Sequence, residues 1–178
     1  MEGLSGKNLV FLDESSVNLG FTRNYARAKK GKRVKEGVID TRYKRKSIIA
    51  VIQKSGVSCP WVFSGTLNKE RFADYIKTKI KPTLTPNDVL VLDNSSVHKS
   101  KLVLDTLEEC GINYQFLPRY SPDFNPIELL WAHMKSTLRK LKARTYEKLD
   151  EGIIFALGLV NTEFIINWFR HCGVNNNG

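Results

Sequence analysis

The sequence predicts an α/β domain in which helices cover a mixed β-sheet. Apolar runs of strand length come first, strands then alternate with amphipathic helices, and the last third follows a helical pattern. The chain has 178 residues, of which 42% are apolar and 26% charged. This is enough for one compact domain with a buried core and too short for two. We therefore expect a single domain over residues 1–178.

The first part of the chain is expected to form strands. NLVFLD (8–13) is an apolar run that ends in an acid, which predicts a buried strand. Residues 47–53 and 57–63 flank the sequence Lys-Ser-Gly and predict a β-hairpin. A short strand over 34–39 is a further candidate. These segments supply one half of the expected sheet.

Strands and helices alternate in the middle of the chain. Asn68 is suited to be the N-cap of a helix that Pro82 would end. DVLVLD (88–93) is a second apolar run that ends in an acid, and a helix is expected over 99–109. A third short strand follows over 113–117. This order suggests one α/β domain with a mixed sheet.

The last third is expected to be helical. Asn125 and Pro126 suit an N-cap and the first helical position, and Glu128 would complete a capping box. Two more amphipathic segments cover 146–159 and 162–170. Apolar residues recur at helical spacing behind Pro126 and form one face: Ile127, Leu130, Trp131, Met134, Leu138 and Leu141.

The positive charge of the chain is concentrated in one segment. The formal net charge is +10, and residues 23–46 hold eleven basic and only two acidic residues, a net of +9. Such a concentration favours a polyanionic partner, nucleic acid before a membrane surface, because phosphate neutralisation releases counterions. A solvated basic loop or a localisation signal is the alternative. The expected DNA contacts are Arg23, Arg27, Lys29, Lys30, Lys32 and Arg33.

Several other classes of protein are disfavoured. No stretch approaches the roughly 20 apolar residues that span a bilayer, and the N-terminus lacks the pattern of a signal peptide. The three cysteines are far apart and form no C-x-x-C pair, which argues against a disulfide framework and a structural zinc site. We expect no membrane partner and a reducing interior.

Three acids are candidates for metal-dependent chemistry. Asp13 and Asp93 end predicted strands, at the edge of an α/β sheet where ligands bind, and Glu128 lies in the first turn of a helix. Converging carboxylates suit Mg²⁺, and two such ions would hold the attacking and leaving oxygens of a phosphoryl displacement. Glu14 and Asp123 are rival ligands, and each acid could instead cap a turn or a helix.

Three segments resemble the catalytic blocks of the DDE transposases in the mariner-like superfamily, closest to its bacterial insertion-sequence branch. They are FLDESSVNLGFTRNYARAKKGKR (11–33), VLDNSSVHKS (91–100) and LPRYSPDFNPIELLWAHMK (117–135). Asp93 and Glu128 are separated by 34 residues, a spacing typical of that superfamily. The resemblance covers nearly the whole chain.

The resemblance implies a ribonuclease H-like fold, with a mixed five-stranded sheet flanked by helices. It implies that Asp13, Asp93 and Glu128 are catalytic and bind two Mg²⁺ ions, for which Mn²⁺ would substitute. The implied activity is that of a Mg-dependent DDE superfamily endonuclease: DNA cleavage at transposon ends, followed by strand transfer into target DNA. The partners would be double-stranded DNA and a second copy of the chain in the DNA complex.

One departure from the family concerns DNA recognition. We expect no N-terminal helix-turn-helix domain before the first predicted strand, so that either a separate helix-turn-helix protein or reading frame supplies it, or the chain is an excised domain. The alternatives are a domesticated or inactive DNA-binding remnant, and a ribonuclease H or resolvase-like nuclease. We expect the protein in the nucleoid-containing cytoplasm of a bacterium, or in the nucleus of a eukaryote.

Overall fold

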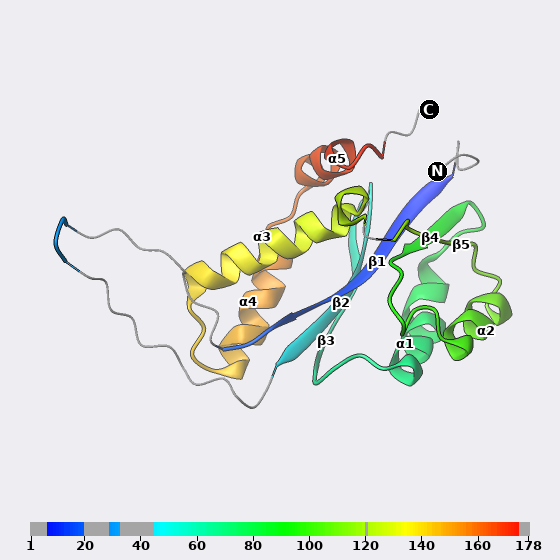
Figure 1. Ribbon diagram of the computed structural model, residues 1–178, viewed down its shortest axis with the longest axis horizontal. Coiled ribbons are helices and arrows are strands. Elements are labelled where there is room, and N and C mark those ends of the chain that lie inside the picture. Colours follow the sequence, from blue (N-terminus) through cyan, green and yellow to red (C-terminus); the bar gives the residue numbers. More distant parts are fainter. Residues whose placement is uncertain (1–6, 20–28, 33–44, 120, 175–178) are drawn as a thin grey trace.

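The computed structural model describes residues 7–19, 29–32, 45–119 and 121–174 and contains a five-stranded mixed sheet (Figure 1). The strand order is β3-β2-β1-β4-β5. The first three strands pair antiparallel, whereas β4 runs parallel to β1 and β5 parallel to β4. The predicted mixed sheet is confirmed, and the candidate strand over 34–39 lies outside the described residues. The strands are β1 (Asn8–Val17), β2 (Lys46–Gln53), β3 (Gly56–Ser64), β4 (Asp88–Leu92) and β5 (Tyr114–Phe116).

Helices cover both faces of this sheet (Figure 1). One face packs against α3, α4 and α5, and the other against α1, η1 and α2. The larger helices are α1 (Lys69–Tyr75), α2 (Lys101–Glu109), α3 (Pro126–Leu141), α4 (Tyr146–Gly158) and α5 (Thr162–His171). Three shorter ones are η1 (Ile76–Ile80), η2 (Lys81–Thr83) and η3 (Pro122–Phe124).

The central strands are apolar throughout because both of their faces are buried. Successive residues of β1 enter opposite cores: Phe11 packs on the side of α3, and Leu12 on the side of α1 and α2. Val91 and Leu92 divide in the same way on β4. Because successive side chains of each strand are buried on opposite faces of the sheet, both segments are continuous apolar runs rather than alternating apolar and polar patterns.

The first helix begins as predicted but ends differently. The Asn68 side chain accepts a hydrogen bond from the Arg71 backbone N–H at 2.9 Å, as an N-cap does. Pro82 does not lie beyond the end of the helix, as predicted, but inside η2. It occupies the first turn of this 3₁₀ helix, where a backbone N–H has no hydrogen-bond partner within the helix and can be absent. A π-helical turn, η1, connects α1 to η2.

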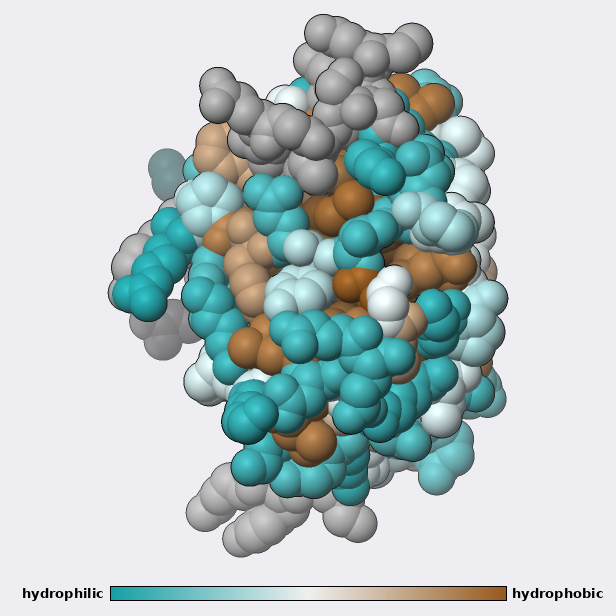
Figure 2. All heavy atoms as spheres, turned by 90° about the vertical axis from the view of Figure 1, so that its right-hand side faces the viewer, coloured by the Kyte–Doolittle hydropathy of each residue, from teal (hydrophilic) through white to brown (hydrophobic). Residues whose placement is uncertain are grey.

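Hydrophilic side chains cover most of the surface seen from the side of α2 and β5, with smaller hydrophobic areas between them (Figure 2). Within the described ranges, no single helix is long and apolar enough to cross a membrane. The helices α4 and α5 meet those limits of length and composition only as a pair, and a bend of 78° separates them.

Candidate active site

Asp13 lies where the parallel part of the sheet ends. The parallel pairing of β1 with β4 stops at Leu12 and Leu92, so Asp13 and Asp93 are the next residues on neighbouring chains. The prediction that Asp13 ends its strand is wrong: β1 continues to Val17, because β2 goes on pairing with it in antiparallel register. Asp13 nevertheless occupies the carboxyl edge of the parallel strands, as expected.

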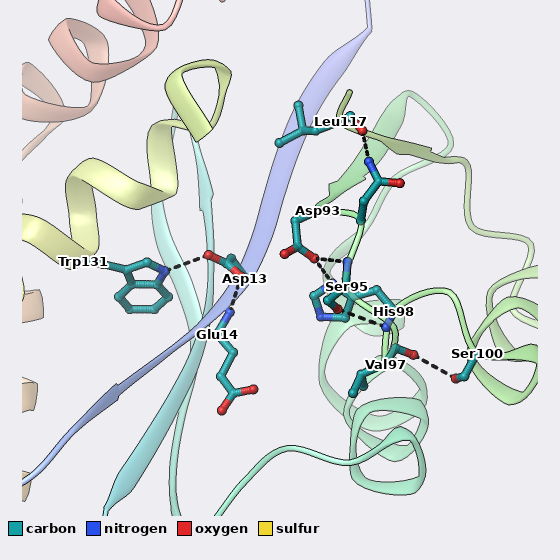
Figure 3. A network of polar contacts seen from close by, with 10 residues as sticks. Asp13, Glu14, Asp93, Ser95, Val97, His98, Ser100, Leu117 and Trp131 are labelled. Atoms are coloured by element: carbon teal, nitrogen blue, oxygen red, sulfur yellow. Dashed lines mark hydrogen bonds and ion pairs between the residues drawn. The ribbon is translucent and has the colours of Figure 1, made fainter. Parts of the chain in front are cut away.

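The Asp13 carboxylate is buried and held on both oxygens. Its Oδ1 accepts the Glu14 backbone N–H at 2.7 Å, and its Oδ2 accepts the indole N–H of Trp131 at 3.2 Å (Figure 3). Only 8% of the residue is exposed. Burial raises the pKa of Asp13 to about 7. The hydrogen bond from the Glu14 N–H lowers this pKa, whereas the negative charges of Asp93 and Glu128 raise it further.

Asp93 directly follows β4 and is oriented by its own loop. Its Oδ1 accepts the Ser95 backbone N–H at 3.0 Å and lies 2.5 Å from Nδ1 of His98 (Figure 3). Burial raises the pKa of Asp93, but the hydrogen bonds from His98 and Ser95 outweigh it and hold the pKa below 3.8. The two aspartates therefore differ in charge state near neutral pH, although they are neighbours.

The loop that carries Asp93 is attached to the neighbouring strand. The Asn94 side-chain N–H donates to the Leu117 carbonyl oxygen, and the Leu117 N–H donates to the Leu92 carbonyl oxygen at 2.9 Å. His98 is 3% exposed and its ring packs against that of Phe72, with centroids 4.4 Å apart and the planes inclined by 31°. These contacts fix the loop on both sides, so the position of Asp93 is set by β5 and by α1.

Glu128 faces the same space from α3. It is exposed in the first turn of this helix and lines a pocket of about 420 Å³ together with Asp93. Asn125 occupies the N-cap position, as predicted, but its side chain makes no capping bond. Its Oδ1 is buried and has no hydrogen-bond partner among the described residues. Glu128 lines the pocket, and the Asn125 backbone N–H, to which a capping-box glutamate would turn back, donates to the Pro122 carbonyl oxygen at 2.9 Å.

The pocket also contains basic side chains that lie outside the segment of expected DNA contacts and belong to an alternative DNA path. Lys99 and Arg119 lie in its wall, and Nζ of Lys99 is 5.0 Å from the centroid of the Phe116 ring. Single lysines and arginines carry little signal in a sequence with 28 of them. The remaining lining residues are Asn94, Ser95, Leu117, Pro118, Ser121, Pro122 and Asn125.

The rival acids do not line this pocket. Glu14 forms an ion pair with Arg45 at 3.9 Å, and Asp123 is exposed in η3. Of the three favoured acids, Asp93 and Glu128 line the pocket, and Asp13 does not, although the charges of both raise its pKa. Carboxylate oxygens are ligands that suit Mg²⁺. Among the described residues, no three His, Cys, Asp or Glu side chains form a group that could hold a metal ion as they stand. Metal binding by the triad therefore stays a prediction.

The basic segment is only partly described. Lys29, Lys30 and Lys32 are exposed in a turn, which the Lys32 N–H closes by donating to the Lys29 carbonyl oxygen at 3.0 Å. The other predicted DNA contacts, Arg23, Arg27 and Arg33, lie outside the described residues.

The fold is similar to that of Mos1 mariner transposase. The Mos1 strand transfer complex aligns with a TM-score of 0.71 and 20% identity over 97% of this chain and 56% of that one. The Mos1 paired end complex with Mn gives a TM-score of 0.73 and 20% identity over 91% of this chain and 51% of that one. The isolated Mos1 catalytic domain gives 0.67 and 19% identity over 94% and 77%. The chain thus spans about half the length of the full transposases and has the predicted ribonuclease H-like fold.

Sequence comparison gives the family directly. No curated protein sequence matches the chain. The model of the DDE superfamily endonucleases matches residues 8–150, a segment that contains Asp13, Asp93 and Glu128. Because this match covers most of the chain, the protein belongs to the DDE superfamily endonucleases.

Proposed function

We propose that this chain is a transposase catalytic domain that cleaves DNA strands at transposon ends and transfers them into target DNA. One observation carries the proposal: the segment shared with the endonuclease family contains three acids, of which Asp93 and Glu128 line one pocket and Asp13 lies near enough to both for their charges to raise its pKa. The fold is also that of Mos1 complexes described as paired end, pre-cleavage and strand transfer states.

Asp13, Asp93 and Glu128 are the residues that would hold two Mg²⁺ ions, with Mn²⁺ as a substitute. Mos1 complexes with Mn and with Mg have the same fold. The donor set supports the assignment, since a buried carboxylate with a raised pKa gains most from a nearby cation. Bound ions would supply Lewis-acid stabilisation of the charge that develops on phosphate oxygens.

The protein's own groups orient the substrate. Lys99 and Arg119 flank the acids and would contact non-bridging phosphate oxygens, which offsets the repulsion between DNA and three carboxylates. In cleavage, a water oxygen forms a bond to phosphorus as the P–O3′ bond breaks, and the leaving oxygen ends as a 3′-hydroxyl. In strand transfer the oxygen of that hydroxyl forms a bond to a target phosphorus as the target P–O3′ bond breaks, and the target strand leaves with a 3′-hydroxyl. Neither step forms a bond between protein and DNA.

The partners follow from this activity. Double-stranded DNA is the substrate, and a second copy of the chain would hold the other transposon end, as the paired end complexes of Mos1 suggest. A separate helix-turn-helix protein or reading frame would recognise the ends. The basic segment around Arg23, Arg27, Lys29, Lys30, Lys32 and Arg33 would contact the DNA backbone. The protein would act at the bacterial nucleoid, or in the nucleus of a eukaryotic host.

A cleavage assay with matched variants tests the proposal. We expect the chain to nick supercoiled plasmid in Mn²⁺, and to cleave and join duplexes that carry the inverted repeats flanking its gene. Asp13→Asn, Asp93→Asn and Glu128→Gln should each abolish both reactions while DNA affinity remains, because each removes a metal ligand. Asp123→Asn, a change to an exposed acid in η3, should leave activity intact.

Two results would contradict the proposal. Cleavage confined to the RNA strand of an RNA–DNA hybrid would identify a ribonuclease H. DNA binding with no nicking in Mg²⁺ or Mn²⁺, even with a recognition module added, would identify a DNA-binding remnant.

A further inference from the structure

We propose that Trp131 is a positioning residue of the active site, whose indole N–H holds the Asp13 carboxylate and ties it to the helix that carries Glu128. The inference rests on the proposed function for the roles of Asp13 and Glu128. It assigns to Trp131 a part in the site beyond the packing that its apolar spacing predicts.

The contact is specific in its chemistry. Nε1 of Trp131 donates to Oδ2 of Asp13 at 3.2 Å, across 118 residues of sequence. An indole N–H is a donor only, so it fixes an oxygen acceptor at that position and accepts nothing in return. Both residues are buried, with 2% and 8% exposed, so water does not replace the donor easily. Losing it would leave a buried carboxylate oxygen without its side-chain donor.

The two hydrogen bonds of Asp13 come from different elements. The Glu14 N–H that binds Oδ1 lies on β1, the same strand as Asp13, so it does not fix the carboxylate relative to any other element. The Trp131 N–H on Oδ2 belongs to α3 and therefore fixes the carboxylate relative to a second element. With one donor on each oxygen, the plane of the carboxylate is defined (Figure 3).

Helix α3 carries both Trp131 and Glu128. The two residues are three apart, hence neighbours on the helix surface, yet Glu128 is exposed at the pocket and Trp131 is buried below it. The indole ring belongs to the same core as Phe11, two residues before Asp13 on β1. A shift of α3 would therefore move Glu128 and the donor of Asp13 together. Trp131 therefore links the distance between Asp13 and Glu128 to the packing of α3 on the sheet.

The test separates the N–H from the ring. Trp131→Phe keeps an aromatic side chain and removes the donor. Incorporation of β-(3-benzothienyl)alanine at position 131 keeps the bicyclic shape and replaces the N–H by sulfur. Trp168→Phe is the matched control, because Trp168 is half-buried against the same core and stacks on Phe164, and its indole N–H makes no hydrogen bond to a carboxylate within the described ranges. Circular dichroism and thermal unfolding establish which variants are folded.

The first measurement is the affinity for Mn²⁺ alone, without DNA. Both replacements at position 131 should raise the dissociation constant about 10-fold to 100-fold, the range found when partners of metal ligands are removed. Trp168→Phe should leave it unchanged. An unaltered Mn²⁺ affinity in the folded benzothienyl variant would overturn the proposal.

The second measurement follows the indole N–H signals of Trp61, Trp131 and Trp168 by ¹H–¹⁵N NMR. Addition of Mg²⁺ should move the Trp131 signal most, and Asp13→Ala should move it in the metal-free protein. If neither change moves it, the hydrogen bond is absent and the proposal fails. Wild-type protein that does not nick DNA, but shows both NMR responses, would remove the proposed function and leave the positioning role in place.

Discussion

His98 and Asp93 form a close pair at the edge of the candidate active site, with Nδ1 of the imidazole 2.5 Å from Oδ1 of the carboxylate. The ring is almost fully buried and packs against Phe72, so it approaches Asp93 from a fixed direction. With Asp93 ionised, Nδ1 carries the hydrogen and donates it. Asp93 thus has a ring donor from the α1 side of the sheet, as Asp13 has one from α3.

His98→Ala should raise the pKa of Asp93 and weaken Mn²⁺ binding, because it removes a charge-assisted hydrogen bond. His98→Asn places an amide N–H near the position of Nδ1 and should restore much of both properties. His98→Gln, whose amide lies one atom further out, should not. Carboxyl ¹³C NMR titration and Mn²⁺ affinity measure these effects. Equal behaviour of the Asn and Gln variants would show that His98 acts by packing alone.

Asp13 makes the metal-free protein less stable as the pH rises. Its pKa is 3.8 in the unfolded chain and about 7 in the folded one, so between these values the folded state holds a proton that the unfolded state has lost. The free energy of unfolding should therefore fall from about pH 4 to about pH 7, by about 4 kcal/mol from this group, and the loss is complete above pH 7.

Asp13→Asn removes this titration and tests its sign. In EDTA, the variant should be more stable than wild type by about 1–3 kcal/mol at pH 8, because the amide avoids a buried charge but loses one of two hydrogen bonds. The advantage should vanish near pH 4. Urea unfolding at both pH values measures it, with the exposed Asp123→Asn as control. A less stable variant at pH 8 would show that Asp13 is better solvated than its burial implies.

Trp131→Ala should lower the free energy of unfolding by about 3–5 kcal/mol, since it empties a buried aromatic site in the core between α3 and the sheet. Leu141→Ala on the same helix should cost less than about 1 kcal/mol, because Leu141 is 46% exposed. Chemical denaturation of both variants gives the comparison. Similar losses at the two positions would mean that α3 is not anchored through its tryptophan.

The salt dependence of DNA binding locates the phosphate contacts. The slope of log affinity against log salt changes by about 0.9 for each phosphate contact on duplex DNA. Lys99→Ala with Arg119→Ala should reduce it by up to about 1.8, and alanine at Lys29, Lys30, Lys32 and Arg33 by up to about 3.6. Losses should be equal on specific and random sequence.

Lys54→Ala is the control for these substitutions. Lys54 is exposed in the β2–β3 turn, beside Asn8 at the start of β1 and away from the acids. Its removal should leave the slope unchanged. A slope that Lys54→Ala lowers as much as Lys99→Ala would indicate non-specific attraction to the whole basic surface.

The sequence by itself predicted most of the strands and helices and selected the three acids as candidates. Residues 8–13 and 88–93 are apolar without alternation because their strands are buried on both faces, and a polar residue directly after such a run marks the edge of the sheet. The apolar spacing behind Pro126 likewise identified the face of α3 that packs on the sheet, except at Leu141, which is exposed in the last turn. These features are local, so pattern and period were sufficient to predict them.

Only the tertiary structure decided which groups orient the acids. Trp131 lies on the apolar face of its helix, and periodicity predicts no more than burial there; the bond to Asp13 depends on how α3 is placed along β1, 118 residues away. The continuation of β1 to Val17 depends on pairing with β2. Asn125 follows the pattern of a capping residue yet makes no capping bond. Hydrophobic patterning specifies which side of an element is buried, whereas a single hydrogen bond depends on the register in which two distant elements pack.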